Sequence, residues 1–482
     1  MGEAGGDGLA FYSDRMSEQR VHAFTDDALG EHDAVALAEQ VRTGQVNPAE
    51  LVTAAHERLD RIESRLHTVA VPMFDAPRSD GNKSAALFGV PAVLKDNTDL
   101  RGLPTNHGSE AFTGRPAKRD GFYATQYLAT GLTIVAKTRL PEFGFNATTE
   151  YMTGEPVRNP WDTGHSIGAS SGGSAALVAS GVVPIAHAND GGGSIRIPAA
   201  AAGLVGLKAS RGRHIDGEQA RHLPINMVSE GVVTRTVRDT AAFLAAAEDH
   251  WRSRELAPVG LVRGPADRRL RIGVVLDTVT GAVIDDDTRA AVELTASLLE
   301  KAGHVVEPME LPITAQFADD FVQYWALLAD LASSTGKLLY SRSFDAAKTD
   351  GLTQGLRRHP RRTLARTVPA LRRLKRTLRR YTEMFAHREL VLSPVLAHVV
   401  PELGWISPRV PYDELIERLR QFVTYTPVNN IAGTPAISLP MGLTDAGLPV
   451  GVMLSGAYGD ERTLLEVAFA LEAEHGFPRI QG

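Results

Sequence analysis

Two glycine-rich turns that each carry serine lie in the stretch from His165 to Arg213, where glycine and serine are densest. The first turn reads Gly-Ala-Ser-Ser-Gly-Gly-Ser over residues 168–174, and the second reads Asp-Gly-Gly-Gly-Ser over residues 190–194. Glycine adopts backbone angles that other residues avoid, so successive N–H groups in such a turn can converge on one point. Each turn can therefore approach a ligand closely.

The second turn has the composition of an oxyanion hole with a nucleophile at its edge. Its converging donors would be the backbone N–H groups of Gly191, Gly192, Gly193 and Ser194. The Ser194 hydroxyl is placed to act as the nucleophile. Asp190 and Arg196 bracket the turn, and a charge-assisted bidentate contact between them would fix its conformation. The plainer alternative is a glycine-rich loop that turns a corner or binds phosphate.

A second interpretation makes the first turn nucleophilic. Residues 168–172 fit the G-x-S-x-G pattern of the α/β-hydrolase elbow, with Ser170 at its centre. An elbow needs a β-branched strand before it, whereas residues 159–165 (Asn-Pro-Trp-Asp-Thr-Gly-His) are typical of a loop. His165 and His187 flank the serine turns, so these residues alone leave a histidine as an alternative general base.

Three motifs together carry a resemblance to a known family. The segment Gly-Val-Pro-Ala-Val-Leu-Lys-Asp-Asn at residues 89–97 precedes a G-x-S-S-G-G-S turn and a D-x-G-G-S-I-R turn, whose serines Ser170 and Ser194 are 24 positions apart. The chain thus resembles the amidase signature family of serine amide hydrolases, from about residue 31 onward. Gly191 departs from the family pattern, in which many members carry threonine or isoleucine at this position.

The resemblance implies a Ser–cisSer–Lys triad. Ser194 would be the acylating nucleophile, Ser170 the bridging serine that follows a cis peptide bond, and Lys95 the base. A serine hydroxyl is weakly nucleophilic until a neighbour takes its proton, and a lysine can do this only when burial keeps it neutral. The apolar residues 90–94 predict a strand that carries Lys95 inward, with Asp96 pointing elsewhere.

Supporting roles follow from the same resemblance. Ser171 would contribute a hydrogen bond behind the triad, and Asp190 with Arg196 would hold the second turn. Lys137, which ends a similar apolar segment, receives no role. Neither a metal ion nor an organic cofactor is expected.

The family resemblance implies an α/β fold with a large mixed twisted central sheet flanked by helices on both faces and a helical insertion in the C-terminal half. The expected divisions are a poorly ordered tail at 1–30 and one domain at 31–482, with a catalytic core at about 80–260, a helical substrate-pocket insertion at about 318–420 and a return to the core at 421–482. Either Met1 or Met16 suits the natural start of the chain.

Local patterns predict individual elements. Asn47-Pro48-Ala49-Glu50 supplies an N-cap, a first-turn proline and an acid for a helix. Further along, residues 270–276, 287–302 and 304–309 predict a strand, a helix and a strand, which is an α/β unit. From 318 to 389 the pattern changes to long helices.

A basic amphipathic helix is predicted at residues 357–380, which carry eleven Arg and Lys residues and no acid. Its apolar residues recur at helical spacing and predict one buried face, made of Leu364, Val368, Leu371, Leu374 and Leu378. Pro369 is a point where such a helix can kink. One interpretation is contact with an anionic membrane surface or nucleic acid. The favoured interpretation is a solvated face packed on the core through its leucines, at a subunit contact such as that of a homodimer.

Composition narrows the function further. The 482 residues have a net charge of −6, which argues against a general nucleic-acid binder. With no cysteine in the sequence, disulfides, thiolate nucleophiles and cysteine-based metal sites are excluded, and a cytoplasmic location is expected. No secretory signal pattern begins the chain. Residues 166–189 are interrupted by glycine, histidine and proline, which predicts a buried core segment and not a membrane span.

Three functions are compatible with these residues. The first is an amidase that cleaves linear carbon–nitrogen bonds of small carboxamides, because the Asp-Gly-Gly-Gly-Ser-Ile-Arg-Ile-Pro-Ala segment resembles bacterial amidases and cyclic-dimer amide hydrolases. The second is the glutaminase subunit of a tRNA-dependent amidotransferase, which would need partner chains. The third is a binding protein that acts through the basic helix, and the intact set of Lys95, Ser170 and Ser194 argues against it.

Overall fold

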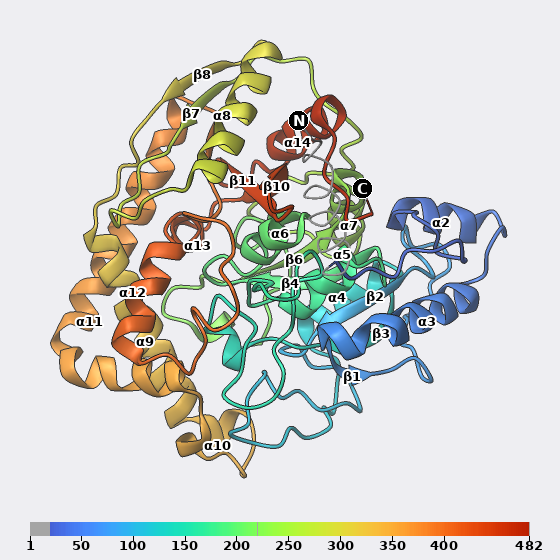
Figure 1. Ribbon diagram of the computed structural model, residues 1–482, viewed down its shortest axis with the longest axis horizontal. Coiled ribbons are helices and arrows are strands. Elements are labelled where there is room, and N and C mark those ends of the chain that lie inside the picture. Colours follow the sequence, from blue (N-terminus) through green and yellow to red (C-terminus); the bar gives the residue numbers. More distant parts are fainter. Residues whose placement is uncertain (1–19, 219, 482) are drawn as a thin grey trace, which may run out of the picture.

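An eleven-stranded mixed sheet is the centre of the computed structural model, which describes residues 20–218 and 220–481 (Figure 1). Its strands are β1 (Val69–Pro72), β2 (Pro91–Lys95), β3 (Thr133–Thr138), β4 (Ile185–Asp190), β5 (Val205–Lys208), β6 (Ser229–Thr234), β7 (Arg271–Val274), β8 (Val305–Pro308), β9 (Leu390–Pro394), β10 (Ala436–Leu443) and β11 (Pro449–Gly456). Their order is β1-β3-β2-β4-β6-β5-β10-β11-β9-β7-β8. Parallel pairs link β2 to β3 and β4, and β7 to β8 and β9, and the other pairs are antiparallel.

Helices surround this sheet. They are α2 (Ala34–Arg42), α3 (Pro48–Leu66), α4 (Phe122–Ala129), α5 (Gly172–Ala179), α6 (Arg196–Ala202), α7 (Val237–His250), α8 (Asp286–Lys301), α9 (Gln316–Ser334), α10 (Gly336–Leu339), α11 (Gly351–Glu383), α12 (Tyr412–Phe422), α13 (Pro427–Ala432) and α14 (Glu461–His475). Short 3₁₀ turns are η1 (Glu142–Gly144), η2 (Ala220–His222), η3 (Ala346–Lys348) and η4 (Met384–Ala386). Among the described helices, none combines the length and the apolar character needed to cross a bilayer.

Both faces of the sheet are covered by helices, as the fold class predicted. Along β11, successive side chains point to opposite faces. Val452 and Leu454 belong to the same apolar cluster as Leu464 of α14, whereas Met453 belongs to the cluster that contains Ala200 of α6. The two helices therefore cover opposite sides of the same strand.

The parallel pairing of β2 with β4 sets up the site. Ala92 lies beside Ile185 and Val93 beside Ala186, so the carboxyl ends of the two strands meet at one edge of the sheet. β2 ends at Lys95, and β4 ends at Asp190, where the second glycine turn begins. The first glycine turn leads directly into α5. As predicted, residues 166–189 form a fully buried segment.

Chain packing begins before residue 31, so the predicted tail is wrong for residues 20–30. Val21, Ala23 and Leu29 are buried, and the Val21 N–H donates to the Pro160 carbonyl at 2.7 Å. Three apolar residues in a polar stretch are enough to dock it on the core. Residues 1–19, including the two candidate start positions, lie outside the described residues.

The helical segment of the C-terminal half gathers at one side of the sheet, where α9, α11 and α12 lie far from α2 and α3 (Figure 1). β9 falls inside the predicted insertion of about 318–420 and joins the central sheet between β11 and β7, so that span is not purely helical. α11 is continuous through Pro369. Its predicted apolar face is wrong at Val368, which is 56% exposed, and correct at Leu374, which is buried.

The N-cap of α3 gives a test of local stability. The Asn47 side chain accepts the Glu50 N–H at 3.0 Å, and the Glu50 carboxylate accepts the Asn47 N–H at 2.9 Å. We expect Asn47→Ala to lower the free energy of unfolding by about 1 kcal/mol, because a helix-end donor loses its acceptor. Asn47→Asp keeps an acceptor and should retain stability in the same denaturation experiment; equal losses in both variants would contradict the capping argument.

Candidate active site

The amino group of Lys95 lies in a fully buried position at the end of β2. Its Nζ atom is 2.8 Å from Ser170 Oγ, 3.0 Å from Ser171 Oγ and 2.7 Å from Asn189 Oδ1. Ser170 follows a cis peptide bond after Ala169. The structure therefore brings together the lysine and the first serine turn, which are 75 residues apart in the sequence.

Burial lowers the pKa of Lys95 to about 7, against the opposing pull of the Glu230 and Asp190 carboxylates. Asp96, the residue next in sequence, points elsewhere as expected: its Oδ1 lies 2.6 Å from Lys137 Nζ. Lys137, which received no role from the sequence, is thus the partner of Asp96. Near neutral pH a substantial fraction of the Lys95 side chain is uncharged.

The three contacts of Lys95 have distinct hydrogen-bonding roles when the amine is neutral. A neutral amine has two N–H donors and one lone pair. The Asn189 Oδ1 atom can only accept, and the Ser171 hydroxyl donates its own hydrogen to the Ser194 carbonyl at 2.7 Å, so both accept from Lys95. The lone pair then faces Ser170, whose hydroxyl can donate to it.

The second turn is held by a buried ion pair between Asp190 and Arg196. The Arg196 Nε atom is 2.9 Å from Asp190 Oδ2, and Nη2 is 3.0 Å from Oδ1. Asn430 adds a donor to Asp190 Oδ1 at 2.9 Å. Burial opposes ionisation of Asp190, but the Arg196 charge prevails and holds the pKa of this carboxyl well below its usual range. This is the bidentate lock that the sequence suggested.

One of the four predicted oxyanion donors is already engaged. The Gly193 N–H donates to Asp190 Oδ1 at 2.6 Å and thereby holds the turn. The prediction that the Gly193 N–H belongs to the oxyanion hole is therefore wrong. Within residues 20–218 and 220–481, the N–H groups of Gly191, Gly192 and Ser194 donate to no protein acceptor. These three N–H groups are therefore available to a ligand.

Neither histidine that flanks the turns is placed as a base. His187 Nδ1 accepts the backbone N–H of Lys95 at 3.2 Å, and its Nε2 lies 2.9 Å from Glu230 Oε2. The accepting Nδ1 requires the tautomer whose proton sits on Nε2, which donates to the carboxylate. His165 is paired with Asp162. In the described part of the chain, neither ring is hydrogen-bonded to Ser170 or Ser194.

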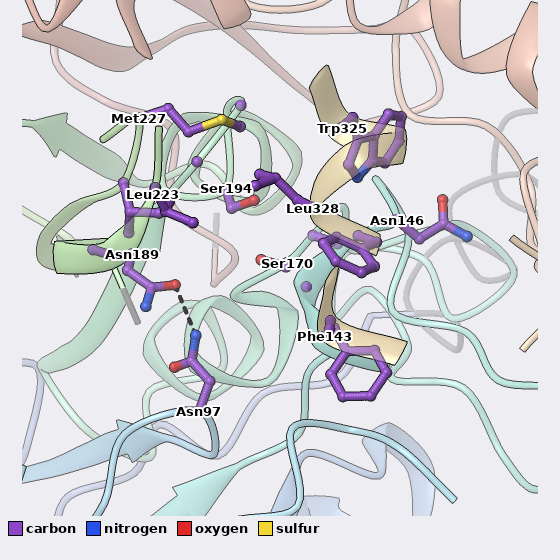
Figure 2. A pocket seen from close by; sticks show the side chains of 18 of the residues that line it. Asn97, Phe143, Asn146, Ser170, Asn189, Ser194, Leu223, Met227, Trp325 and Leu328 are labelled. Atoms are coloured by element: carbon purple, nitrogen blue, oxygen red, sulfur yellow. Dashed lines mark hydrogen bonds between the residues drawn. The ribbon is translucent and has the colours of Figure 1, made fainter. Parts of the chain in front are cut away.

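A cavity of about 870 Å³ opens at the two serines. Ser170 and Ser194 line it, whereas Lys95 lies behind Ser170 and does not. Figure 2 shows Ser170 and Ser194 between two groups of side chains, with Asn97, Asn189, Leu223 and Met227 on one side and Phe143, Asn146, Trp325 and Leu328 on the other. No cluster of three or more His, Asp or Glu side chains suited to a metal ion occurs among the described residues.

Several polar contacts at the site escaped sequence reasoning. Asn189 accepts from both Lys95 and Asn97, and Thr426 donates to the Gly192 carbonyl at 2.6 Å. Asn430 reaches the second turn from α13, 240 residues further along the chain. The only available signals were the positions of Asn97 and Asn189 beside the motif residues Asp96 and Asp190, because contacts between distant segments leave no local pattern.

Comparison with known proteins agrees with this geometry. The Amidase family model matches residues 50–465. The chain belongs to the amidase family. It is 47% identical over 466 residues to the protein named "Putative amidase AmiC" of Mycobacterium leprae (strain TN), covering 96% of this chain and 99% of that protein. As a family member it is an amide hydrolase with the mixed α/β fold of amidase signature enzymes.

Three further matches share less sequence with this chain. The 6-aminohexanoate-cyclic-dimer hydrolase of Paenarthrobacter ureafaciens is 32% identical over 91% of this chain and 94% of its own. A solved structure of 6-aminohexanoate cyclic dimer hydrolase superposes with a TM-score of 0.81 at 28% identity, over 95% of this chain and 99% of that one. A glutamyl-tRNA(Gln) amidotransferase chain of Thermotoga maritima, with a TM-score of 0.70 at 23% identity over 94% and 96% of the two chains, shares the fold.

The buried ion pair of the second turn predicts a large loss of stability on removal of one partner. We expect Arg196→Met to cost about 3–5 kcal/mol, because the Asp190 carboxylate stays buried without its cation. Arg42→Met removes a pair with Glu39 in which both side chains are more than half exposed, and should cost only about 0–1 kcal/mol. Thermal unfolding of both variants measures the difference, and comparable losses would argue against the lock.

Proposed function

We propose that this amidase is a serine hydrolase that cleaves carboxamides through an acyl-enzyme on Ser194, with Ser170 and Lys95 as its proton relay. The observation that carries the proposal is the buried contact between Lys95 Nζ and Ser170 Oγ at 2.8 Å, at the edge of a cavity that Ser194 also lines. The products are a carboxylate and ammonia or an amine.

In the acylation step, Ser194 Oγ attacks the carbonyl carbon of the substrate and forms a C–O bond. The proton of Ser194 passes to Ser170 Oγ as the Ser170 proton passes to the lone pair of Lys95. The charge that develops on the carbonyl oxygen meets the N–H groups of Gly191, Gly192 and Ser194, whose directions are fixed before the substrate binds.

Collapse of the tetrahedral intermediate breaks the C–N bond. The protonated Lys95 returns its proton through Ser170 to the leaving nitrogen, which departs as ammonia or an amine. Water then attacks the ester carbonyl on Ser194 while the same relay accepts one water proton. Collapse of this second intermediate breaks the bond between the acyl carbon and Ser194 Oγ, the relay returns its proton to Ser194 Oγ, and the acid leaves and ionises to a carboxylate. The pKa of Lys95 suits both directions, because a group near neutrality both accepts and donates at physiological pH.

The proposed substrates are linear carboxamides of small-molecule size, which fit the cavity of about 870 Å³. We place their hydrolysis in the cytoplasm because the sequence lacks cysteine. The name of the cyclic-dimer hydrolase makes the cyclic dimer of 6-aminohexanoate the obvious comparison compound. Glutamine belongs in the same panel, because it tests the glutaminase alternative directly. Amine or ammonia release from each compound identifies the class of amide that the enzyme hydrolyses.

Analytical ultracentrifugation of the same preparation tests the proposed homodimer.

Replacement of the proposed nucleophile should abolish hydrolysis. We expect Ser194→Ala to reduce kcat/KM by several orders of magnitude, because no covalent intermediate can form. Ser64→Ala, on the exposed side of α3, is the matched control and should keep parental activity. A Ser194→Ala enzyme that keeps more than about a tenth of the parental rate would refute the assignment. If Ser170→Ala abolishes hydrolysis while Ser194→Ala has only a mild effect, the elbow mechanism is favoured instead.

The pH dependence tests the relay. The acylation rate should rise with pH through about 7, as Lys95 loses its proton, and this limb should vanish in Lys95→Met. Because the Glu230 charge raises the pKa of Lys95, Glu230→Gln should move the limb to lower pH. Single-turnover kinetics across the pH range measure both effects, with exposed Glu57→Gln as control. A limb that persists in Lys95→Met would exclude lysine as the base.

A further inference from the structure

One face of α9 lines the cavity along most of the helix. Its large apolar side chains follow each other at intervals of four, four, three and three residues, which places them on a single face. They are Phe317, Phe321, Trp325, Leu328 and Leu331. The cavity therefore runs lengthwise beside the helix, in the manner of a groove.

The catalytic turn lies near the beginning of this groove. A Cβ atom built on Gly192 would lie 3.2 Å from Cζ of Phe321, so the second glycine turn lies against the second turn of α9. With a rise of 1.5 Å per residue, the helix continues for about 20 Å from Phe321 to its end at Ser334. The groove is thus much longer than a small carboxamide.

The far end of the groove is apolar and open to solvent. Leu338 and Leu339 of α10 line the cavity and are 85% and 60% exposed. On the neighbouring wall, Phe143 stacks with Tyr340 at 5.2 Å between ring centroids. Exposed apolar side chains that continue the lining of a cavity indicate a binding surface.

Five charged side chains line the cavity, and none of them belongs to α9 or α10: Asp99, Arg115, Glu218, Glu230 and Arg420. Arg420 of α12 is paired with Asp319 at 2.6 Å. Burial lowers the pKa of His107 to about 3, so its ring is neutral. The α9 groove therefore suits an uncharged chain.

We propose that the preferred substrates are carboxamides that carry an extended apolar chain on one side of the amide, and that this chain lies along α9 with its end at α10. The proposal rests on the proposed function of the same site. Each methylene group that leaves water for this groove should raise kcat/KM by about fourfold until the chain reaches the mouth.

Two substrate series test the chain preference, both kept below the micellar range. The first consists of p-nitroanilides of linear acids from acetyl to dodecanoyl, and the second of acetamides of linear amines from methyl to dodecyl. A steady rise of kcat/KM with length in either series supports the proposal. Flat or falling values in both series, with the short amides still cleaved by a Ser194-dependent reaction, overturn it and leave the proposed function intact. Absence of cleavage of every amide overturns both.

A matched pair of variants locates the chain. Ala332 lines the cavity, whereas Ser334, two residues further along α9, is exposed and does not. We expect Ala332→Trp to lower the ratio of long-chain to short-chain kcat/KM at least tenfold, because the indole fills the groove. Ser334→Trp should keep the wild-type ratio. An unchanged ratio in Ala332→Trp would refute the placement of the chain.

A third variant keeps the placement testable if Ala332→Trp does not fold. Leu338→Asp puts a charge at the exposed mouth, where the fold tolerates it. It should lower the long-chain to short-chain ratio, because a carboxylate would have to lose water beside the chain. A long-chain preference equal to that of the wild type in a folded Leu338→Asp enzyme would contradict the proposal.

Discussion

Burial of a lysine whose pKa falls to about 7 is the constraint on which the rest of the site depends. A charged ammonium group in this position would lose its hydration without a carboxylate in contact, since the partners of Lys95 Nζ are two hydroxyls and an amide oxygen. The position is created by parallel pairing of β2 and β4, which brings Lys95 beside Asn189 at one edge of the sheet. The fold thus produces the unusual protonation state through topology before any local chemistry is added.

The second turn solves the opposite electrostatic problem. Here both charges are retained, and Arg196 and Asp190 satisfy one another with the help of Asn430. A compensated pair adds only a weak field at Lys95, so the amine can stay close to neutrality although a carboxylate lies nearby. A charged pair that holds one turn and a lysine with a lowered pKa at the other turn therefore lie within the same buried region.

The compact motifs of the sequence named residues that the structure brings together, whereas the catalytic roles of these residues stay a proposal. Each residue is positioned by its own strand end or glycine turn, and the set consists of Lys95, Ser170, Ser171, Ser194, Asp190 and Arg196. The engagement of Gly193 was missed, since the same glycine pattern allows its N–H to point either way. Asn189 and Asn430 were missed because side-chain contacts across 94 and 240 residues depend on tertiary packing. The error at Val368 has the same origin, for helical periodicity does not tell which face a neighbouring helix covers.

The position of Lys95 behind Ser170 has a chemical consequence of its own. An uncharged primary amine is a stronger nucleophile than a hydroxyl, and an ester on Ser194 would be open to aminolysis by it. Attack would transfer the acyl group to nitrogen and leave a stable amide on the enzyme, which would be inactivated after one turnover. Lys95 is fully buried and does not line the cavity, so in the proposed mechanism the acyl carbon would be shielded from the amine while protons would pass through Ser170. In that mechanism the intervening serine would let Lys95 act as a base without acting as a nucleophile.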